Sequence, residues 1–182
     1  MATGPRYKVD YRRKREGKTS YKKRLGLLKS GKTRLVVRKS NKYLLAQIVD
    51  YDEDGDKVVT TTRSDELKKF NWKCSTKNTP AAYLTGLLCG YKSKAKKINS
   101  AIVDLGLQPS TKGSRLYALI KGVLDAGLQI PVNKEIFPSD DRIKGKIISD
   151  YNKNDVVMKN FDETKSSIEK KFINKEVSKK NG

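Results

Sequence analysis

Between residues 34 and 63, short apolar runs alternate with turn residues, and this pattern predicts an antiparallel meander of three strands. Val, Ile, Leu, Tyr and Thr dominate these runs, as is typical of strands. The three runs are RLVVRKS (34–40), YLLAQIVDY (43–51) and KVVTTTR (57–63). Asn41-Lys42 makes the first tight connection, and Asp54-Gly55 marks the second hairpin turn.

The pattern then changes to a helical period. SDELKKFNW (64–72) predicts a short helix with Ser64 as its N-cap. PAAYLTGLLCGYKSKAKK (80–97) predicts a longer one, because Asn78 or Thr79 caps it and lysines gather at its end.

A strand, a helix and a last short strand follow. AIVDLGL (101–107) is typical of a buried strand, and RLYALIKGVLDAG (115–127) predicts a helix with Ser114 as its cap and Gly127 as its stop. Residues 128–130 predict the short strand. Since the chain crosses over through a helix to reach 101–107, that strand can lie parallel to the first one. The sequence therefore predicts an α/β domain, with a mixed sheet and helices packed on it.

The two ends of the chain differ from this body. Residues 1–10 predict an extended arm, and residues 11–29 predict helix with Gly17-Lys18-Thr19 as the expected break, before a turn at 30–32. We expect residues 131–161 to be irregular and residues 163–180 to form a final helix. That helix needs a partner surface for one apolar stripe. The stripe consists of Ile168, Phe172, Ile173 and Val177.

Charge separates the N-terminal region from the rest. The 182 residues carry a formal net charge of +21, and residues 1–42 hold 16 Lys or Arg against two acids, a net of +14. In YRRKREGKTSYKKRL (11–25), eight of fifteen residues are basic. Such an asymmetry indicates a basic arm that binds a polyanion. The alternative is a solvated charge run with no partner.

Aromatic residues within the arm favour nucleic acid as that polyanion. Tyr7, Tyr11 and Tyr21 are interleaved with Arg and Lys, which suits stacking on bases or riboses beside phosphate contacts. Arginine dominates the first basic cluster, and its fork binds phosphate in a bidentate manner. A membrane surface is a weaker candidate, because apolar anchors are few here.

Composition excludes several other classes of protein. There is no histidine, so histidine-based triads and bases are excluded, and two cysteines are too few for a zinc site. Cys74 and Cys89 are typical of reduced thiols in an intracellular protein. We find neither the hydrophobic stretch of a signal peptide nor the roughly 20 apolar residues of a membrane helix.

Two motifs match functional patterns without their structural context. GLLKSGKT (26–33) fits the phosphate-binding P-loop, which needs a strand before it and a helix after it. Here the predicted order is reversed. DYDEDGD (50–56) matches the start of a calcium loop, but Thr61 stands where a bidentate Glu is needed. We interpret the first as a turn and the second as an acidic hairpin. A nucleotide-dependent enzyme using Lys32 is kept as the rival hypothesis.

Several long segments together resemble one family of ribosomal proteins. They are GPRYKVDYRRKREGKTSYKKRLGLLKSGKTRLVVRKS (4–40), TPAAYLTGLL (79–88), DLGLQPSTKGSRLYALIKGVLDAGLQIP (104–131) and IFPSDDRIKG (136–145). In this order they look like the archaeal form of the large-subunit protein that is called eighteen in bacteria and archaea and five in eukaryotes. The resemblance covers about residues 2–150.

The resemblance implies a structural role without catalysis, cofactor, metal or small-molecule substrate. The family binds 5S ribosomal RNA and anchors it to the large ribosomal RNA in the central protuberance, beside other large-subunit proteins that include the second 5S-binding protein. It also implies a cytoplasmic location in the large subunit, and a three-layer α/β sandwich with a mixed five-stranded sheet of ribonuclease H-like topology. We expect a basic arm and helix (1–30), an α/β core (31–130) and an irregular segment with a C-terminal helix (131–182). A general basic nucleic-acid binder is the remaining alternative.

RNA contacts are carried over from the resemblance position by position. The main contacts fall in the arm and first helix: Arg6, Tyr7, Lys8, Arg12, Arg13, Lys14, Arg15, Lys18, Thr19, Tyr21, Lys22, Lys23 and Arg24. Further contacts are Arg38 and Lys39 at the end of the first strand, and Thr111, Lys112, Ser114 and Arg115 before and at a helix start. Backbone N–H groups at that helix start suit a phosphate.

Overall fold

A four-stranded mixed sheet forms one layer of the protein. The computed structural model describes residues 4–180, and the side chains of residues 4–172. The strands lie in the order β3-β2-β1-β4, and their bounds are Arg34–Lys39 (β1), Leu44–Asp50 (β2), Lys57–Arg63 (β3) and Ile102–Asp104 (β4). The first three form the predicted antiparallel meander, and β4 runs parallel to β1, as the crossover requires.

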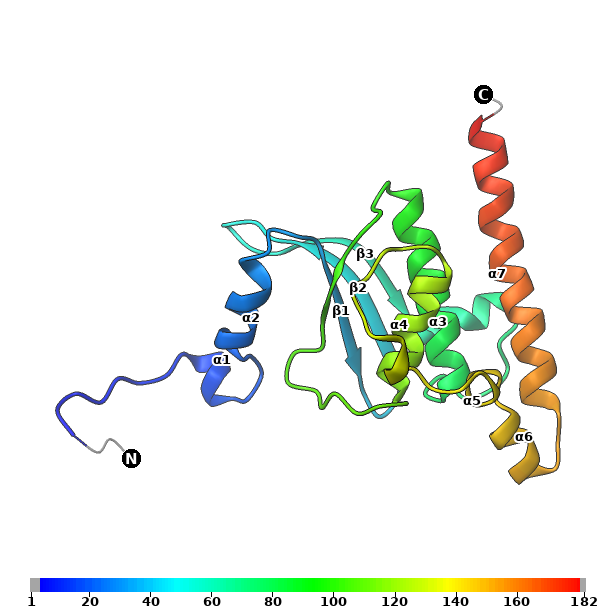
Figure 1. The fold of residues 1–182 in the computed structure, drawn as a ribbon, viewed down its shortest axis with the longest axis horizontal. Helices are drawn as coiled ribbons and strands as arrows, with labels where there is room; N and C mark the ends of the chain where they lie inside the picture. Colours follow the sequence, from blue (N-terminus) through cyan, green and yellow to red (C-terminus); the bar gives the residue numbers. More distant parts are fainter. Residues whose placement is uncertain (1–3, 181–182) are drawn as a thin grey trace.

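Two helices, α3 (Thr79–Ala95) and α4 (Arg115–Asp125), cover one face of this sheet (Figure 1). Asn78 caps α3 by accepting a hydrogen bond from the backbone N–H of Ala81 at 2.9 Å. Alternate residues of β1 and β2 point at the helices and are fully buried, among them Leu35, Val37 and Ile48. The α/β class is therefore confirmed.

Glycine allows α3 and α4 to lie unusually close together. A Cβ atom at Gly86 of α3 would lie 1.9 Å from the backbone oxygen of Leu119 in α4. A Cβ at Gly122 of α4 would lie 2.1 Å from the backbone oxygen of Tyr83 in α3. Each helix therefore presents backbone, without a side chain, at the point where the other crosses it.

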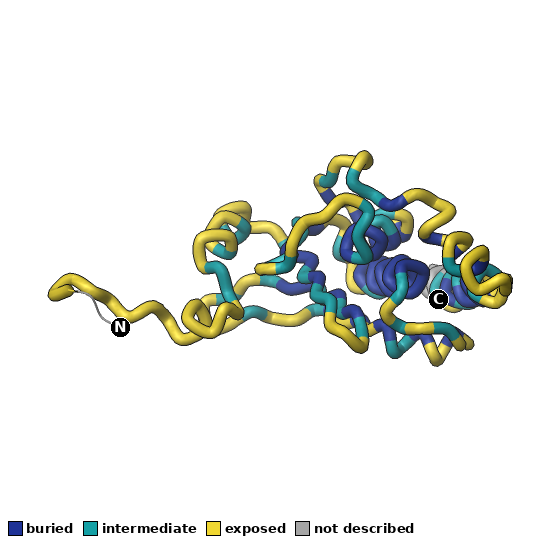
Figure 2. Tube along the Cα trace, turned by 90° about the horizontal axis from the view of Figure 1, so that it is seen from below, coloured by how far each residue is buried: buried dark blue, intermediate teal, exposed yellow. Residues whose placement is uncertain are grey.

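The C-terminal helix α7 (Val156–Lys180) packs against the outer side of α3, so the body has a third layer (Figures 1 and 2). Ile168 is fully buried there, and the Phe172 ring stacks on Tyr91 with centroids 5.6 Å apart. The described half of the predicted apolar stripe, Ile168 and Phe172, thus finds its partner surface within the chain. The side chains of Ile173 and Val177 fall outside the described residues.

The N-terminal region extends away from the body as expected (Figure 2). Helix α1 (Arg12–Arg15) and helix α2 (Tyr21–Leu28) are separated by the predicted break, where Gly17 adopts a φ of +61°. The turn after α2 uses Gly31, also with a φ of +61°, to enter β1. The arm and α7 lie at opposite ends of the longest axis of the molecule (Figure 1).

Several details correct the sequence predictions. Residues 128–130 do not form a full strand, because Gln129 makes only an isolated bridge to Ser100, and the sheet has four strands among the described residues rather than five. Helix η1 (Ser64–Phe70) is a 3₁₀-helix whose predicted cap, Ser64, is its first residue. The Ser64 hydroxyl instead accepts a hydrogen bond from the Leu44 backbone.

Residues 131–161 are also less irregular than predicted. They contain η2 (Lys134–Ile136), α5 (Asp140–Lys144), α6 (Lys146–Asn152) and the start of α7. Two of these helices are only five and seven residues long and are separated by Gly145 at a φ of +85°. Segments this short carry almost no readable period, which is why the sequence did not indicate them.

Candidate nucleic-acid interface

The arm presents its basic side chains to solvent. The predicted contacts Arg6, Tyr7 and Lys8 lie in an exposed segment without regular structure, and every residue from 12 to 18 is exposed. Tyr11 and Tyr21 lie on opposite sides of the helix break, and their ring centroids are 5.2 Å apart at an angle of 55°. This aromatic pair links α1 to α2 and leaves the surrounding Arg and Lys groups available for an anion.

Three ion pairs within the arm occupy some of these cations. Lys14 lies 2.6 Å from Asp10, Lys18 lies 2.8 Å from Glu16, and Arg12 lies 3.7 Å from the same Glu16. All of these side chains are more than a third exposed, so each pair contributes little to stability and can exchange for a phosphate.

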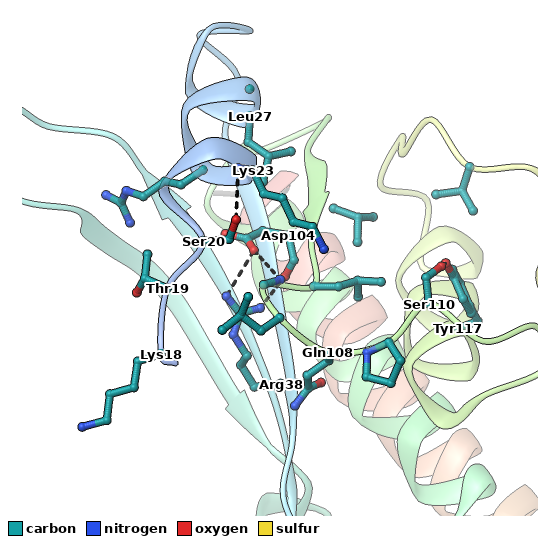
Figure 3. A pocket seen from close by; sticks show the side chains of 18 of the residues that line it. Lys18, Thr19, Ser20, Lys23, Leu27, Arg38, Asp104, Gln108, Ser110 and Tyr117 are labelled. Atoms are coloured by element: carbon teal, nitrogen blue, oxygen red, sulfur yellow. Dashed lines mark hydrogen bonds and ion pairs between the residues drawn. The ribbon is translucent and has the colours of Figure 1, made fainter. Parts of the chain in front are cut away.

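A cleft of about 790 Å³ separates the arm and α2 from the loop that follows β4 (Figure 3). Lys23 and Leu27 extend from α2 toward the side of the cleft that carries Ser110 and Tyr117, whereas Lys18 points away from it (Figure 3). The cleft brings together six of the predicted contacts, which are Arg13, Lys18, Thr19, Lys23, Arg24 and Arg38. Predicted contacts outside this cleft are Arg6, Tyr7, Lys8, Arg12, Lys14, Arg15, Tyr21, Lys22, Lys39, Thr111, Lys112, Ser114 and Arg115.

A buried ion network lies beneath α2. Arg24 of α2 lies 2.9 Å from one oxygen of Asp56, and Arg34 of β1 lies 2.7 Å from the other. Arg34 is only 1% exposed and also lies 3.3 Å from Asp104. Burial by itself would raise the pKa of Asp56, but hydrogen bonds from Arg34 and Arg24 outweigh burial and hold that pKa below its usual value. Asp56 is therefore a charged link between the arm and the sheet.

The other end of β1 is fixed to the loop after β4. Arg38 donates to the backbone oxygen of Asp104 at 2.6 Å and lies 3.1 Å from its carboxylate. The Lys39 backbone exchanges two hydrogen bonds with the Gln108 side chain, at 3.1 and 2.9 Å. The two predicted contacts on β1 thus lie beside the loop that forms one wall of the cleft.

The four predicted contacts around the start of α4 differ in their surroundings. Ser114 occupies the N-cap position, but its hydroxyl makes no capping hydrogen bond and is buried without a partner. Arg115 donates to the backbone oxygen of Lys77 at 2.5 Å. Thr111 and Lys112 are exposed. The prediction that Ser114 caps the helix through its side chain was wrong.

The P-loop match has the reversed context that was predicted. Helix α2 precedes Ser30 and strand β1 follows Thr33, so the segment leads into a strand and not into the helix that a P-loop requires. Ser30 and Lys32 are tied into the turn, because the Lys32 backbone donates to the Ser30 hydroxyl at 3.3 Å. The backbone of this segment therefore lacks the arrangement that a nucleotide phosphate needs.

The acidic motif and the thiols offer no reactive centre in the part of the chain described. Residues 50–56 connect β2 to β3 as a hairpin, and no cluster of three metal-ligating side chains occurs within the residues that the structure describes. Burial raises the pKa of the Cys89 thiol to about 11, and burial also raises that of Cys74. Both cysteines are free. In addition, no described helix is both long and apolar enough to cross a membrane.

Sequence reasoning missed the acidic residues of the interface. Asp56 and Asp104 each contact two arginines, yet neither residue was assigned a role in the interface from the sequence. Asp56 lies in an acidic hairpin that the sequence predicts to be exposed to solvent. Its partners, Arg24 and Arg34, are 32 and 22 positions away in the sequence. A pattern along the chain carries no signal for contacts that depend on how the sheet places α2.

The basic arm and the cleft give the α/β body a positively charged surface, and this charge suits a polyanion. A family model described as "Ribosomal large subunit proteins 60S L5, and 50S L18" matches residues 5–99. The large ribosomal subunit protein uL18 of Methanococcoides burtonii is 48% identical over 172 residues, which cover 94% of this chain and 99% of that protein. Protein uL18 of Korarchaeum cryptofilum is 52% identical over 151 residues, 83% of this chain and 77% of that protein.

The chain therefore belongs to the family of large-subunit ribosomal proteins that comprises 60S L5 and 50S L18. This assignment confirms the family resemblance. It also supports the predicted absence of catalysis, because the relatives are ribosomal proteins rather than enzymes. The rival hypothesis of a nucleotide-dependent enzyme is not favoured.

Proposed function

We propose that the protein is a structural component of the large ribosomal subunit that binds 5S ribosomal RNA and attaches it to the large ribosomal RNA in the central protuberance. The observation that carries the proposal is an exposed basic arm on a chain of this family, within an N-terminal region (residues 1–42) of net charge +14. The positive charge explains the attraction to RNA, and membership of the family indicates that the assembly is the large ribosomal subunit.

Most contacts should go to phosphate and sugar. The major groove of an A-form helix is too deep and narrow for side chains to read, so recognition rests on RNA shape and on unpaired regions. The arginines of α1 suit bidentate phosphate contacts, and the Tyr11–Tyr21 pair offers aromatic surface beside them. The nineteen positions predicted from the sequence, from Arg6 to Arg115, remain our proposed RNA contacts.

The further partners in this proposal are the large ribosomal RNA and neighbouring large-subunit proteins, including the other protein that binds 5S RNA. The location that follows is the cytoplasm, within the large subunit. The division into residues 1–30, 31–130 and 131–182, and the relation of the body to ribonuclease H-like folds, are part of the same proposal.

Competitive filter binding tests the choice of RNA. Labelled 5S ribosomal RNA is bound at near-physiological salt with magnesium and competed either by unlabelled 5S RNA or by an unrelated structured RNA of equal length. We expect only 5S RNA to compete well. Equal competition by both would mean that the arm binds any RNA through charge alone, which contradicts the proposed function.

A truncation tests the role of the arm. Deleting residues 1–24 should weaken 5S binding and flatten its dependence on salt. About 8–10 phosphate contacts by the intact chain correspond to a log–log salt slope of roughly −6 to −9. A truncated protein that binds as tightly, with the same slope, would place the RNA-binding surface outside the arm.

A further inference from the structure

One carboxylate joins the basic helix α2 to the body of the protein. The two oxygens of Asp56 face different elements, since Oδ1 lies 2.9 Å from Arg24 of α2 and Oδ2 lies 2.7 Å from Arg34 of β1. Asp56 sits between β2 and β3, and its side chain is 24% exposed. It is therefore held by the sheet and reaches outward to the helix.

Little else fixes α2 in place. The helix has no fully buried residue. Among residues 4–172, the Arg24–Asp56 contact is the one ion pair that connects α1 or α2 to the body, because the other ion pairs of the arm lie within the arm. A helix of eight residues with so little packing is not held by its own stability.

The partner of Asp56 on the sheet side is rigid. Arg34 is 1% exposed, and its guanidinium lies between Asp56 and Asp104. If the buried Arg34 moved away, the carboxylates of Asp56 and Asp104 would lose a cationic partner, which costs free energy. Arg34 therefore keeps Asp56 both ionised and oriented. Asp56 thus transfers the rigidity of the sheet to an otherwise loosely held helix.

We propose that Asp56 is a positioning residue for RNA binding: it fixes α2 over the sheet, so that Lys23 and Arg13 line the same cleft as Arg38. This inference rests on the proposed function. It opposes the simplest electrostatic expectation, in which a carboxylate among RNA-binding cations repels phosphate and its removal tightens binding. Positioning reduces the conformational freedom that would otherwise be lost on binding.

The first experiment compares two neutralised aspartates in 5S RNA binding. Asp56→Asn and Asp54→Asn remove the same charge from the same hairpin, and Asp54 has no ion pair among the described residues. We expect Asp56→Asn to weaken binding about three- to tenfold with an unchanged salt slope, because no phosphate contact is lost. Asp54→Asn should bind as the unmodified protein does or slightly tighter, and Asp56→Glu should restore part of the loss.

The second experiment reads the position of α2 without RNA. Spin labels on Gly26→Cys in α2 and Lys69→Cys in η1, with Cys74→Ser and Cys89→Ala, report the distance between helix and body. Both labelled positions are exposed. We expect a narrow distance distribution that Asp56→Asn broadens and Asp54→Asn does not change. Urea unfolding of each variant shows whether the body remains folded.

The outcomes separate this proposal from the proposed function. An unchanged distance distribution in Asp56→Asn overturns the positioning role, whatever the RNA results are. A broadened distribution with equal or tighter 5S binding also overturns it, since α2 would then bind RNA without being fixed. If the unmodified protein shows no preference for 5S RNA, the proposed function fails, while the distance measurement still decides whether Asp56 holds α2.

Discussion

Arg38 and Asp104 are joined by two contacts that cross from β1 to β4: Nη1 of Arg38 donates to the Asp104 backbone oxygen at 2.6 Å, and Nη2 lies 3.1 Å from its carboxylate. The same carboxylate lies 3.3 Å from the buried Arg34. One aspartate therefore fixes two arginines of a single strand. It supports the short parallel pairing of β4 and the wall of the cleft together.

Replacing Asp104 should destabilise the protein strongly. Asp104→Asn leaves the buried Arg34 with one carboxylate instead of two and removes the ionic partner of Arg38. We expect a loss of about 3 kcal/mol or more in the free energy of unfolding, as measured by urea denaturation. Asp54→Asn is the control and should change it by less than about 0.5 kcal/mol. Equal stabilities of the two variants would contradict the importance of the network.

The ion pairs of Asp56 should make stability depend on acid. Its pKa is lowered in the folded protein from the usual value of 3.8, so the unfolded chain binds a proton more readily than the folded one. The contribution of Asp56 is complete well above pH 3.8 and is lost as the pH falls through the lowered value. The free energy of unfolding, measured at several values between about pH 5 and pH 2, should therefore decrease less steeply with falling pH for Asp56→Asn than for the unmodified protein. If the free energy of unfolding fell equally steeply with pH in both proteins, the pKa of Asp56 would be the same in the folded and the unfolded state, which contradicts this prediction.

Two glycine-to-alanine changes should have different effects on stability. Gly86→Ala places a methyl group against the Leu119 backbone, and backbone cannot move aside as a side chain can. We expect a loss of about 1–3 kcal/mol or more in unfolding free energy. Gly26 lies in α2 with nothing within 4 Å of an added Cβ, so Gly26→Ala should leave unfolding of the body unchanged and raise the helicity of α2. Circular dichroism during urea denaturation measures both effects.

The two thiols should differ in reactivity. Cys89 is fully buried, and burial raises its pKa to about 11, so it should react with a chromogenic disulfide reagent only after unfolding. Cys74 is partly exposed, although burial raises its pKa as well. In the native protein we expect only Cys74 to be labelled, slowly, and at a rate that increases with pH. In denaturant we expect both thiols to be labelled. Rapid native labelling of both thiols would contradict the packing of α3.

The sequence could predict the parts of the fold that repeat a local pattern. The three strands of the meander follow from the alternation of residues, and the break between α1 and α2 follows from Gly17. The start of α3 was also predicted, with Asn78 and Thr79 as alternative caps, of which the structure selects Asn78. Residues 140–152 were missed because two short helices joined at Gly145 have too little period to detect. The expected strand at 128–130 has strand-like composition, yet tertiary context leaves it a single bridge.

The candidate interface was predictable in its charge and not in its internal geometry. A run of Arg and Lys with interleaved tyrosines is visible in any reading of residues 6–24. That Arg24 faces Asp56, or that Arg38 faces Asp104, depends on how the sheet brings distant residues together. The acidic half of the network therefore became evident only in the structure.

The glycine contact between α3 and α4 has a mechanical consequence. Helices whose backbones touch at Gly86 and Gly122 have no side-chain layer between them to deform, so they cannot slide past each other easily. This stiff pair lies between the sheet, which carries the arm, and α7 at the far end of the molecule (Figure 1). The α/β body thus resembles a strut more than a hinge, and it holds α7 at a set distance from the sheet.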